Sequence, residues 1–317
     1  MKRIGLLTRD CAGVNAAIRA VVRTADYYGI EIVGIFHGYE GLINGEIKVF
    51  NRRSVSGIIN LGGTILKTSR SERFKTKEGQ EMAVRTLKDN NIEGLIVIGG
   101  NGSLTGAHVL AEKYSIPVIG IPATIDNDVN AIDMAIGADT AVNVALDALD
   151  KIRDTSTSLE RIFVVEVMGR NCGYIALRVA LAGGCEEVLF PEGEYNIEKI
   201  CEEITEGNIR GKISWIIIVA EGKAKAADIA KKVTEITALE TREVVLGHIQ
   251  RGGRPTAFDR ILAARYGNFA VQLIKNGEKD KYVGLNNDKL NAIPLKNIVK
   301  PKDIKTEEYY RIIKILT

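Results

Sequence analysis

Short apolar runs of strand length alternate with amphipathic helical patterns along the chain, and this alternation restricts the possible folds more than any other feature. Apolar runs at residues 4–8, 94–100 and 117–121 are separated by segments with apolar residues at helical spacing, such as 14–29 and 103–114. Continuous apolar strands that alternate with helices are typical of a mostly parallel sheet covered on both faces. We therefore expect an α/β fold.

A second series of the same kind begins after a helical pattern at residues 138–153. Strand-like and helical segments alternate again at 162–168, 173–181, 187–190, 197–206, 213–220 and 243–247. The two series predict two Rossmann-like lobes with mostly parallel sheets, in which ligands bind beyond the carboxyl ends of the strands. The long amphipathic helix expected at 257–275 would return the chain to the first lobe.

The overall composition excludes several classes of protein. Hydrophobic residues make up 45% of the 317 residues and charged residues 26%, as in a soluble globular protein, and a net charge of +3 does not indicate nucleic-acid binding. The four cysteines lack the spacing of a disulfide framework or a zinc site, so we expect free thiols in a reducing compartment. No apolar segment has the length of a membrane span or a signal peptide. We expect a cytoplasmic protein.

The segment GLIVIGGNGSLTGA (94–107) reads as a strand, a glycine-rich turn and the start of a helix. Gly99, Gly100 and Gly102 leave room for a phosphate to approach the backbone, and Ser103 is expected to cap the helix. A tight turn without a ligand is the alternative, because glycine-rich turns alone are weak indicators. The Walker pattern is absent, since no Gly-Lys-Ser/Thr follows.

Two carboxylates follow the next strand, in the stretch IPATIDNDVNA (121–131). Phosphoryl transfer needs a group that accepts a hydroxyl proton and a metal ion that neutralises charge, and Asp126 and Asp128 offer one carboxylate for each role. The alternative is an ordinary turn in which Asp and Asn side chains bond their own backbone.

Cationic residues also stand at the ends of two later strands. VVEVMGRNCGYIAL (164–177) carries Arg170, and VLGHIQRGGRP (245–255) carries His248 and Arg251. A guanidinium group forms charge-assisted hydrogen bonds with phosphate oxygens, so these positions suit a phosphorylated substrate. Taken one at a time, Arg170 fits a surface ion pair better and His248 a structural hydrogen bond, so the phosphate interpretation depends on the segments occurring together.

Together these segments resemble the bacterial ATP-dependent 6-phosphofructokinases over nearly the whole chain. The resemblance rests on IGGNGS, PATIDND, RDTSTS, VVEVMGRNCGY and VLGHIQRGG. It implies phosphoryl transfer from ATP to the 1-hydroxyl group of fructose 6-phosphate in glycolysis, within the phosphofructokinase fold. It also implies a larger ATP-binding lobe at 1–137 plus 250–300 and a smaller fructose 6-phosphate-binding lobe at 138–249 plus 301–317.

The resemblance assigns roles to individual residues. Asp126 matches the general base, Thr124 a contact to the sugar or the transferring phosphate, and Arg170 a residue that stabilises charge on the phosphoryl group. The positions that match the substrate pocket are Arg161, Met168, Gly169, Glu221, Arg242, His248 and Arg251. In this family Arg161 and Arg242 reach the pocket of a neighbouring subunit, which implies a homotetramer.

The resemblance also assigns residues to the half of the site that binds the phosphoryl donor. The positions expected to contact ATP are Tyr39, Arg70, Ser71, Lys75, Gly100, Asn101, Gly102 and Ser103, and Mg²⁺ is expected near Asn101 and Asp128. Pyrophosphate-dependent branches usually carry Asp and Lys where this chain has Gly102 and Ala123. These small residues leave space for the α-phosphate of the donor, which favours ATP.

A regulatory site is a further implication. The positions that match the binding site for ADP or phosphoenolpyruvate are Arg19, Arg23, Arg52, Arg153, Gly184, Cys185, Glu186, Arg210 and Lys212. A cluster of cations of this kind would attract a polyanion, whereas isolated surface charges are the alternative interpretation.

Two departures from the family pattern concern the donor half. The usual TSGGDAPGMN is replaced by TRDCAGVN (8–15), which is two residues shorter and places Arg9 where the glycines would be. Asn101 replaces an aspartate that lies near Mg²⁺, and an amide is the weaker partner for a hard cation. A catalytically impaired regulatory or sugar-phosphate-binding subunit, and a pyrophosphate-dependent enzyme, therefore remain as alternatives.

Overall fold

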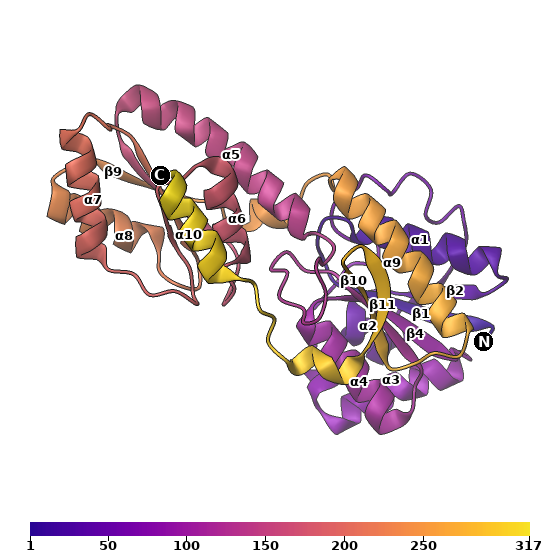
Figure 1. The fold of residues 1–317 in the computed structure, drawn as a ribbon. Coiled ribbons are helices and arrows are strands. Elements are labelled where there is room, and N and C mark those ends of the chain that lie inside the picture. Colours follow the sequence, from indigo (N-terminus) through magenta and orange to yellow (C-terminus); the bar gives the residue numbers. More distant parts are fainter. The chain divides into compact units, whose positions relative to one another are not determined.

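The computed structural model describes residues 1–317 and divides the chain into two compact units (Figure 1). Unit 1 comprises Met1–Thr140 and Arg251–Lys302, and unit 2 comprises Ala141–Gln250 and Asp303–Thr317. The chain thus passes between the units three times: within helix α5 (Ala138–Leu159), after Gln250 and after Lys302. Each unit contains its own sheet and its own core.

Unit 1 is built on a seven-stranded sheet in the order β11-β10-β5-β4-β1-β2-β3. The strands are β1 (Arg3–Thr8), β2 (Glu31–Ile35), β3 (Ile47–Phe50), β4 (Gly94–Gly99), β5 (Val118–Pro122), β10 (Lys281–Asn286) and β11 (Lys289–Pro294). Neighbouring strands from β10 to β2 are parallel, and only β3 and β11 at the two edges pair antiparallel. The central strands β4 and β5 are buried along their whole length, which explains their uninterrupted apolar sequences.

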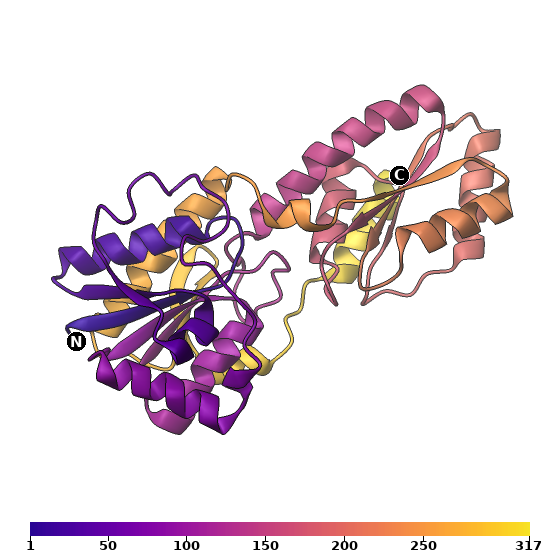
Figure 2. The same ribbon diagram turned by 180° about the vertical axis from the view of Figure 1, so that it is seen from behind.

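Helices cover both faces of this sheet, with α1 and α9 on one face and α2, α3 and α4 on the other (Figures 1 and 2). Their bounds are α1 (Val14–Tyr27), α2 (Gly38–Asn44), α3 (Lys77–Asp89), α4 (Asn101–Tyr114) and α9 (Ala257–Lys275), with short 3₁₀ turns η1 (Arg73–Lys75) and η3 (Leu295–Val299). The helices α1 and α9 pack so closely that a Cβ atom on Gly267 would lie 2.7 Å from that of Ala20.

Unit 2 contains four parallel strands in the order β7-β8-β6-β9. Its elements are β6 (Ile162–Val167), α6 (Tyr174–Gly183), β7 (Glu187–Leu189), α7 (Ile197–Ile209), β8 (Trp215–Ala220), α8 (Ala226–Thr237), β9 (Thr241–Val245), η2 (Gly247–Arg251) and α10 (Thr306–Leu316). The helices α7 and α8 cover one face, while α6, α10 and the later part of α5 lie on the other (Figure 1). The strands point their carboxyl ends to one edge, as in unit 1.

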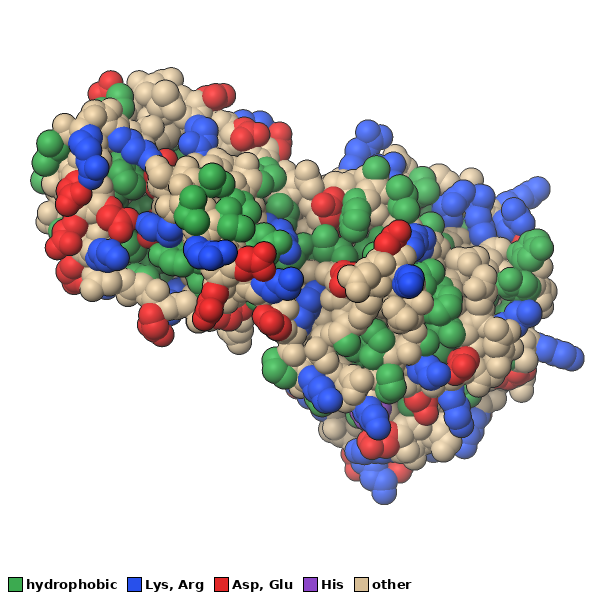
Figure 3. All heavy atoms as spheres, in the orientation of Figure 1, with side chains coloured by type: hydrophobic (Ala, Val, Ile, Leu, Met, Phe, Trp, Pro, Cys, Tyr) green, Lys and Arg blue, Asp and Glu red, His purple; other side chains and the backbone are tan.

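The expected α/β class with mostly parallel sheets is confirmed. The hairpin β10–β11 and the helices α2, α3 and α10 are additions that the periodicity did not predict. All four cysteines are free and buried, as expected of thiols outside a disulfide framework. None of the helices combines the length and the apolar character needed to cross a lipid bilayer. On the visible face of each unit, basic and acidic side chains are interspersed (Figure 3).

Candidate active site

The carboxyl ends of three neighbouring strands of unit 1 bring the glycine-rich and acidic segments together. The register pairs Thr8 of β1 with Ile98 of β4, and Gly99 of β4 with Pro122 of β5. The segments that follow these strands therefore start side by side at one edge of the sheet. A Cβ atom on Gly100 would lie 3.2 Å from the Cβ of Thr124, so the glycine turn and the aspartate-bearing loop are in direct contact.

The loop after β5 holds Asp126 in a buried position. Only 4% of this residue is exposed, and its backbone amide donates to the hydroxyl oxygen of Thr124 at 3.2 Å. Asn127 has a left-handed backbone (φ 47°) and braces the loop, since its Oδ1 accepts from the amide of Ala135 at 2.8 Å and its Nδ2 donates to the carbonyl of Asp133. The side-chain bonds that shape the Asp-Asn-Asp stretch are therefore made by Asn127.

Other ionisable groups surround this loop. Burial raises the pKa of the Cys11 thiol well above its usual value, and the carboxylates of Asp259, Asp10 and Asp126 raise it further, whereas Arg251 lowers it. The thiol donates to the carbonyl of Ile136 at 3.3 Å. Cys11 thus stays protonated, and its environment contains both the carboxylate of Asp126 and the guanidinium group of Arg251.

Helix α4 begins beside this loop with an uncapped amino terminus. The expected cap at Ser103 is wrong: the helix starts at Asn101, its N-cap is Gly100, and no side chain caps it. Ser103 instead lies in the first turn because the backbone bends directly after β4, and its own amide donates to the carbonyl of Gly100. The amides of Asn101 and Gly102 have no hydrogen-bond partner, and a Cβ atom on Gly102 would meet open space. Such an end of a helix can bind an anion.

Asn101 and Asp128 lie next to each other, as a shared metal site requires. The Nδ2 of Asn101 donates to the backbone carbonyl of Asp128 at 3.2 Å, while the buried Oδ1 of Asn101 has no partner. A buried acceptor without a partner is rare, and a magnesium ion or its bound water would satisfy it. The residues present fit a magnesium ion that keeps most of its water ligands, because Asn101 and Asp128 together offer only a few oxygen atoms to it.

The residues expected to contact the nucleotide lie on α2 and on the segment that leads into η1. The ring of Tyr39 stacks on Phe74 with 4.0 Å between centroids, and its hydroxyl donates to the carbonyl of Ser103 at 2.7 Å. Burial raises the pKa of Tyr39, so its hydroxyl remains a donor. Tyr39 therefore ties α2 to the first turn of α4.

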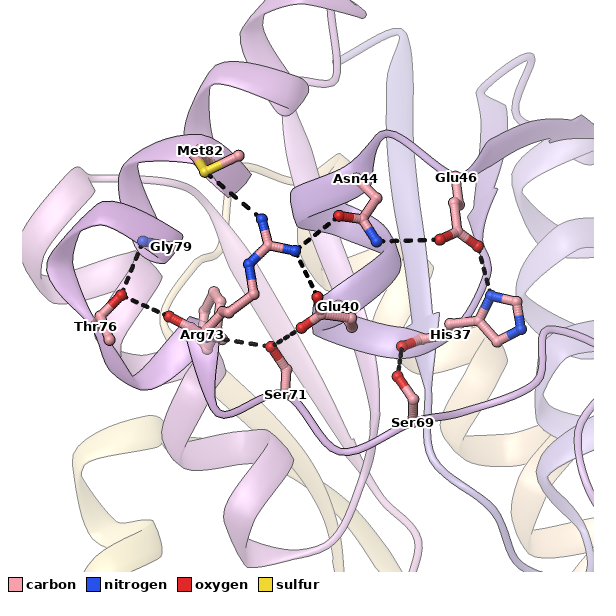
Figure 4. A network of polar contacts seen from close by, with 11 residues as sticks. His37, Glu40, Asn44, Glu46, Ser69, Ser71, Arg73, Thr76, Gly79 and Met82 are labelled. Atoms are coloured by element: carbon pink, nitrogen blue, oxygen red, sulfur yellow. Dashed lines mark hydrogen bonds and ion pairs between the residues drawn. The ribbon is translucent and has the colours of Figure 1, made fainter.

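Ser71 belongs to the polar network in Figure 4. Its hydroxyl donates to Glu40 at 2.6 Å, and Glu40 also accepts from Arg73 at 2.6 Å. Lys75 pairs with Glu72 on the surface, and Arg70 is exposed with no hydrogen-bond or ion-pair partner. Of the four residues expected on this surface, Arg70 is thus the one whose charge is available for a ligand.

In unit 2, the segment after β6 has a backbone that Glu221 holds in place. Glu221 Oε1 accepts from the amides of Gly169 at 3.4 Å and Arg170 at 3.1 Å. Arg170 adopts a left-handed conformation (φ 50°), and a Cβ atom on Gly222 would lie 1.6 Å from its carbonyl oxygen. This conformation therefore depends on glycine at position 222. The side chain of Arg170 is exposed.

Gln250 is a member of this region that the sequence analysis did not single out. It is fully buried, and its Oε1 accepts from the amide of Met168 at 2.8 Å. This bond joins η2, which carries His248, to the segment that carries Met168, Gly169 and Arg170. The only signal in the sequence was its position inside the quoted motif VLGHIQRGG. The side chain of His248 is exposed.

The two residues expected to act on a neighbouring subunit share one partner in the single chain. Arg161 donates to Glu240 at 2.8 Å, and Arg242 forms an ion pair with the same carboxylate. Glu240 is exposed to solvent, and the two guanidinium groups outweigh its partial desolvation, so that its pKa lies below the usual value. Arg161 and Arg242 are therefore adjacent, as a joint role requires.

The nine residues expected at a regulatory site are divided between the units. Arg19, Arg23 and Arg52 lie in unit 1, and the others lie in unit 2. In unit 1, desolvation and the neighbouring charge of Arg23 lower the pKa of Arg19, so these two side chains form one basic region, and Arg52 pairs with Asp26.

In unit 2, most of the residues expected at the regulatory site form a cluster of their own. Arg153 donates to the carbonyls of Gly183 and Gly184, and burial raises the pKa of Cys185 to about 12 against the lowering effect of Arg153. Glu186 accepts from the amide of Ile216 at 2.7 Å and pairs with Lys212 at 3.1 Å. Arg210, in contrast, pairs with Glu206 one helical turn away on the surface.

Comparisons with known proteins find similar sequences over the whole chain. The family model described as Phosphofructokinase matches residues 3–274. The ATP-dependent 6-phosphofructokinase of Natranaerobius thermophilus is 50% identical over 319 residues, and that of Clostridium tetani is 52% identical over 319 residues, with 100% of both chains covered in each case.

A solved structure shows the same fold. The phosphofructokinase from Saccharomyces cerevisiae superimposes with a TM-score of 0.87 at 34% identity, over 94% of this chain. The chain spans 45% of the length of that yeast protein. Most of this chain therefore corresponds to a part of the larger yeast polypeptide.

Proposed function

The chain belongs to the phosphofructokinase family, and on this basis we propose that it transfers the γ-phosphoryl group of ATP to the 1-hydroxyl group of fructose 6-phosphate. The products are fructose 1,6-bisphosphate and ADP, which places the protein in glycolysis. The full-length likeness to curated ATP-dependent enzymes carries this proposal. The buried carboxylate beside an uncapped helix end supports it from the structure.

Asp126 acts as the general base. Its carboxylate accepts the proton of the sugar hydroxyl while the oxygen attacks the terminal phosphorus of ATP, a contribution of roughly 10²–10⁴-fold to the rate. Its burial supports this role, because a carboxylate shielded from bulk water can receive the proton of the substrate without competition from solvent. The hydroxyl of Thr124, which orients the amide of Asp126, also contacts the reacting groups.

Donor phosphates bind at the amino terminus of α4. The free amides of Asn101 and Gly102 donate to phosphate oxygens, and the open space at Gly102 admits them. Asn101 and Asp128 would hold Mg²⁺, which neutralises charge on the phosphates when it is bound. Gly102 and Ala123 leave the space that the α-phosphate of ATP needs, and this favours ATP over pyrophosphate. The adenosine part lies against Tyr39, Arg70, Ser71 and Lys75.

Unit 2 binds fructose 6-phosphate, and unit 1 binds ATP. The backbone around Met168 and Gly169, the carboxylate of Glu221 and the side chain of His248 hold the sugar phosphate together with Arg251, which belongs to unit 1. Arg170 stabilises the charge that develops on the transferred group. Arg161 and Arg242 complete the pocket of a neighbouring subunit, so the active form is a homotetramer.

Regulation and location complete the proposal. ADP or phosphoenolpyruvate binds through the basic residues on α1 and the cluster around Glu186, as the resemblance implies. The protein acts in the cytoplasm on small molecules, without nucleic-acid or membrane partners.

A coupled assay tests the proposal directly. The purified protein with ATP, Mg²⁺ and fructose 6-phosphate is expected to form fructose 1,6-bisphosphate, and pyrophosphate in place of ATP is expected to give little or none. Absence of product under all effector conditions would contradict the kinase function. If calorimetry then detects fructose 6-phosphate but no nucleotide, the protein is a sugar-phosphate-binding subunit.

A further inference from the structure

Arg9 occupies the donor edge of unit 1 in a way that the proposed function does not use. Its backbone amide donates to the carbonyl of Ile98 at 2.8 Å, so the chain after β1 still follows β4 at this point. The side chain then crosses the glycine turn, because a Cβ atom on Gly99 would lie 3.0 Å from the Cγ of Arg9. Nη1 donates to Thr68 Oγ1 at 3.0 Å and to the carbonyl of Ser69 at 2.6 Å.

This path places the side chain of Arg9 beside the other segments that are proposed to bind ATP. The order β5-β4-β1 in the sheet puts the Thr124 loop, the glycine turn and Arg9 next to one another at a single edge. Thr124 contacts one side of the turn at Gly100, and the stem of Arg9 contacts it at Gly99. The free amides at the start of α4 follow directly. A phosphate bound to these amides therefore lies within the neighbourhood of the Arg9 side chain.

The negative charge of a nucleotide bound at this edge of the sheet would have to be neutralised by a nearby cation. ATP brings several negative charges, while Asn101 presents only a neutral oxygen toward a metal ion. The present acceptors of Arg9 Nη1, a hydroxyl and a carbonyl, are both neutral. A phosphate oxygen carries negative charge, so its hydrogen bonds with a guanidinium group gain a Coulomb attraction that a hydroxyl or a carbonyl oxygen does not provide.

We propose that Arg9 binds the phosphate oxygens of ATP directly, releasing Thr68 and Ser69, and that it supplies charge compensation at a donor site with a weak metal partner. This inference rests on the proposed function and adds a specificity-determining residue to the same site. It makes nucleotide binding less dependent on Mg²⁺ than a site whose only cation is the metal.

Calorimetry with ATP in the presence of EDTA tests this role apart from catalysis. Arg9→Ala is expected to raise the Kd for metal-free ATP by roughly 10- to 100-fold, the effect of losing one or two charge-assisted hydrogen bonds. Arg85→Ala, which removes an exposed charge from α3, serves as the control and should leave the Kd unchanged. In kinetics, Arg9→Ala should raise the KM for ATP and leave the KM for fructose 6-phosphate unchanged.

Thr68→Val separates a ligand role from a structural one. This variant removes one resting partner of Arg9 but keeps the guanidinium group. If Arg9 binds phosphate, ATP affinity is retained or increased in Thr68→Val. If Arg9 only fastens the segment at Thr68 and Ser69 to the glycine turn, both variants weaken ATP binding equally, and the proposal is wrong.

Two other outcomes are also decisive. Tighter ATP binding by Arg9→Ala would mean that Arg9 obstructs the site, and this would overturn the proposal. If the native protein forms no fructose 1,6-bisphosphate but its ATP affinity still depends on Arg9, the kinase function fails while this inference stands. Far-ultraviolet circular dichroism of each variant shows that a loss of binding is not a loss of folding.

Discussion

Burial separates the two aspartates of the loop after β5 although they stand two positions apart. Asp126 is 4% exposed, whereas Asp128 is partly exposed and its backbone carbonyl accepts from Asn101. Between them, Asn127 takes over the bonds that shape the loop. A proton acceptor benefits from exclusion of water, and a residue that helps to hold a hydrated metal ion needs access to it. The two environments thus fit the two roles proposed for these residues.

Asp126→Asn tests the role of the base. The amide has the size of the carboxyl group but does not accept the hydroxyl proton, so kcat should fall by roughly 10²–10⁴-fold. The Kd values for ATP and fructose 6-phosphate, measured by calorimetry, should stay close to those of the native protein. Asp128→Asn is the matched variant, and its smaller loss should be reduced by additional Mg²⁺. Full activity of Asp126→Asn would contradict the mechanism.

At the scale of elements, one polar network fastens three pieces of secondary structure together. Glu40 on α2 accepts from Ser71 and from Arg73 of η1, and Arg73 also donates to Asn44 at 3.0 Å (Figure 4). Thr76 then caps α3 by accepting from the amide of Gly79. The segment that carries Arg70 and Ser71 is therefore held against α2, which also carries Tyr39, and the expected nucleotide surface depends on this network.

The stability contributed by Glu40 should depend on pH. The hydrogen bond from Ser71 lowers the pKa of Glu40, burial opposes this, and Arg73 lowers the pKa further. A folded-state pKa below the unfolded value means that the carboxylate stabilises the fold fully above the unfolded pKa and loses this effect as the pH falls through the folded pKa. Glu40→Gln should therefore cost roughly 0.5–1 kcal/mol at neutral pH, since Arg73 is partly exposed.

Thermal unfolding between pH 7 and pH 3 measures this effect. The difference between the native protein and Glu40→Gln should disappear toward the acid end of the range. Glu72→Gln, at an exposed ion pair with Lys75, is the matched control and should show little difference at any pH. A Glu40→Gln difference that does not change with pH would show that the charge has no part in the network.

At the scale of the whole molecule, two units with separate cores are joined by three passages of one chain. In unit 1 the buried Asp259 at the start of α9 accepts from the amides of Gly137 and Thr140, around the start of α5. The start of α5, where the first passage lies, is thus bonded to the start of α9, which follows the second passage. In unit 2, Lys314 of α10 pairs with Glu187 at 3.1 Å and Glu203 at 2.7 Å, and this fixes the end of the chain.

Subunit complementation tests the assembly. Asp126→Asn and Arg242→Ala subunits should each be nearly inactive alone. If Arg242 completes the pocket of a neighbour, mixed tetramers should recover roughly a quarter of native activity, because half of the subunits carry the base and half of their neighbours carry the arginine. Two different affinity tags identify the mixed tetramers. Mixed tetramers without recovered activity would show that Arg242 serves its own subunit.

Local patterns in the sequence determined the fold class, most helices and strands, and the acidic and glycine-rich segments, because periodicity and turn chemistry depend on neighbouring residues. They did not determine the pairing of β10 with β5, the start of α4 at Asn101, or the contacts between Gln250 and Met168 and between Arg9 and Thr68. The last two contacts join residues 82 and 59 positions apart. Only the tertiary structure decides such contacts, since they depend on which strand ends become neighbours in a sheet and not on any repeat along the chain.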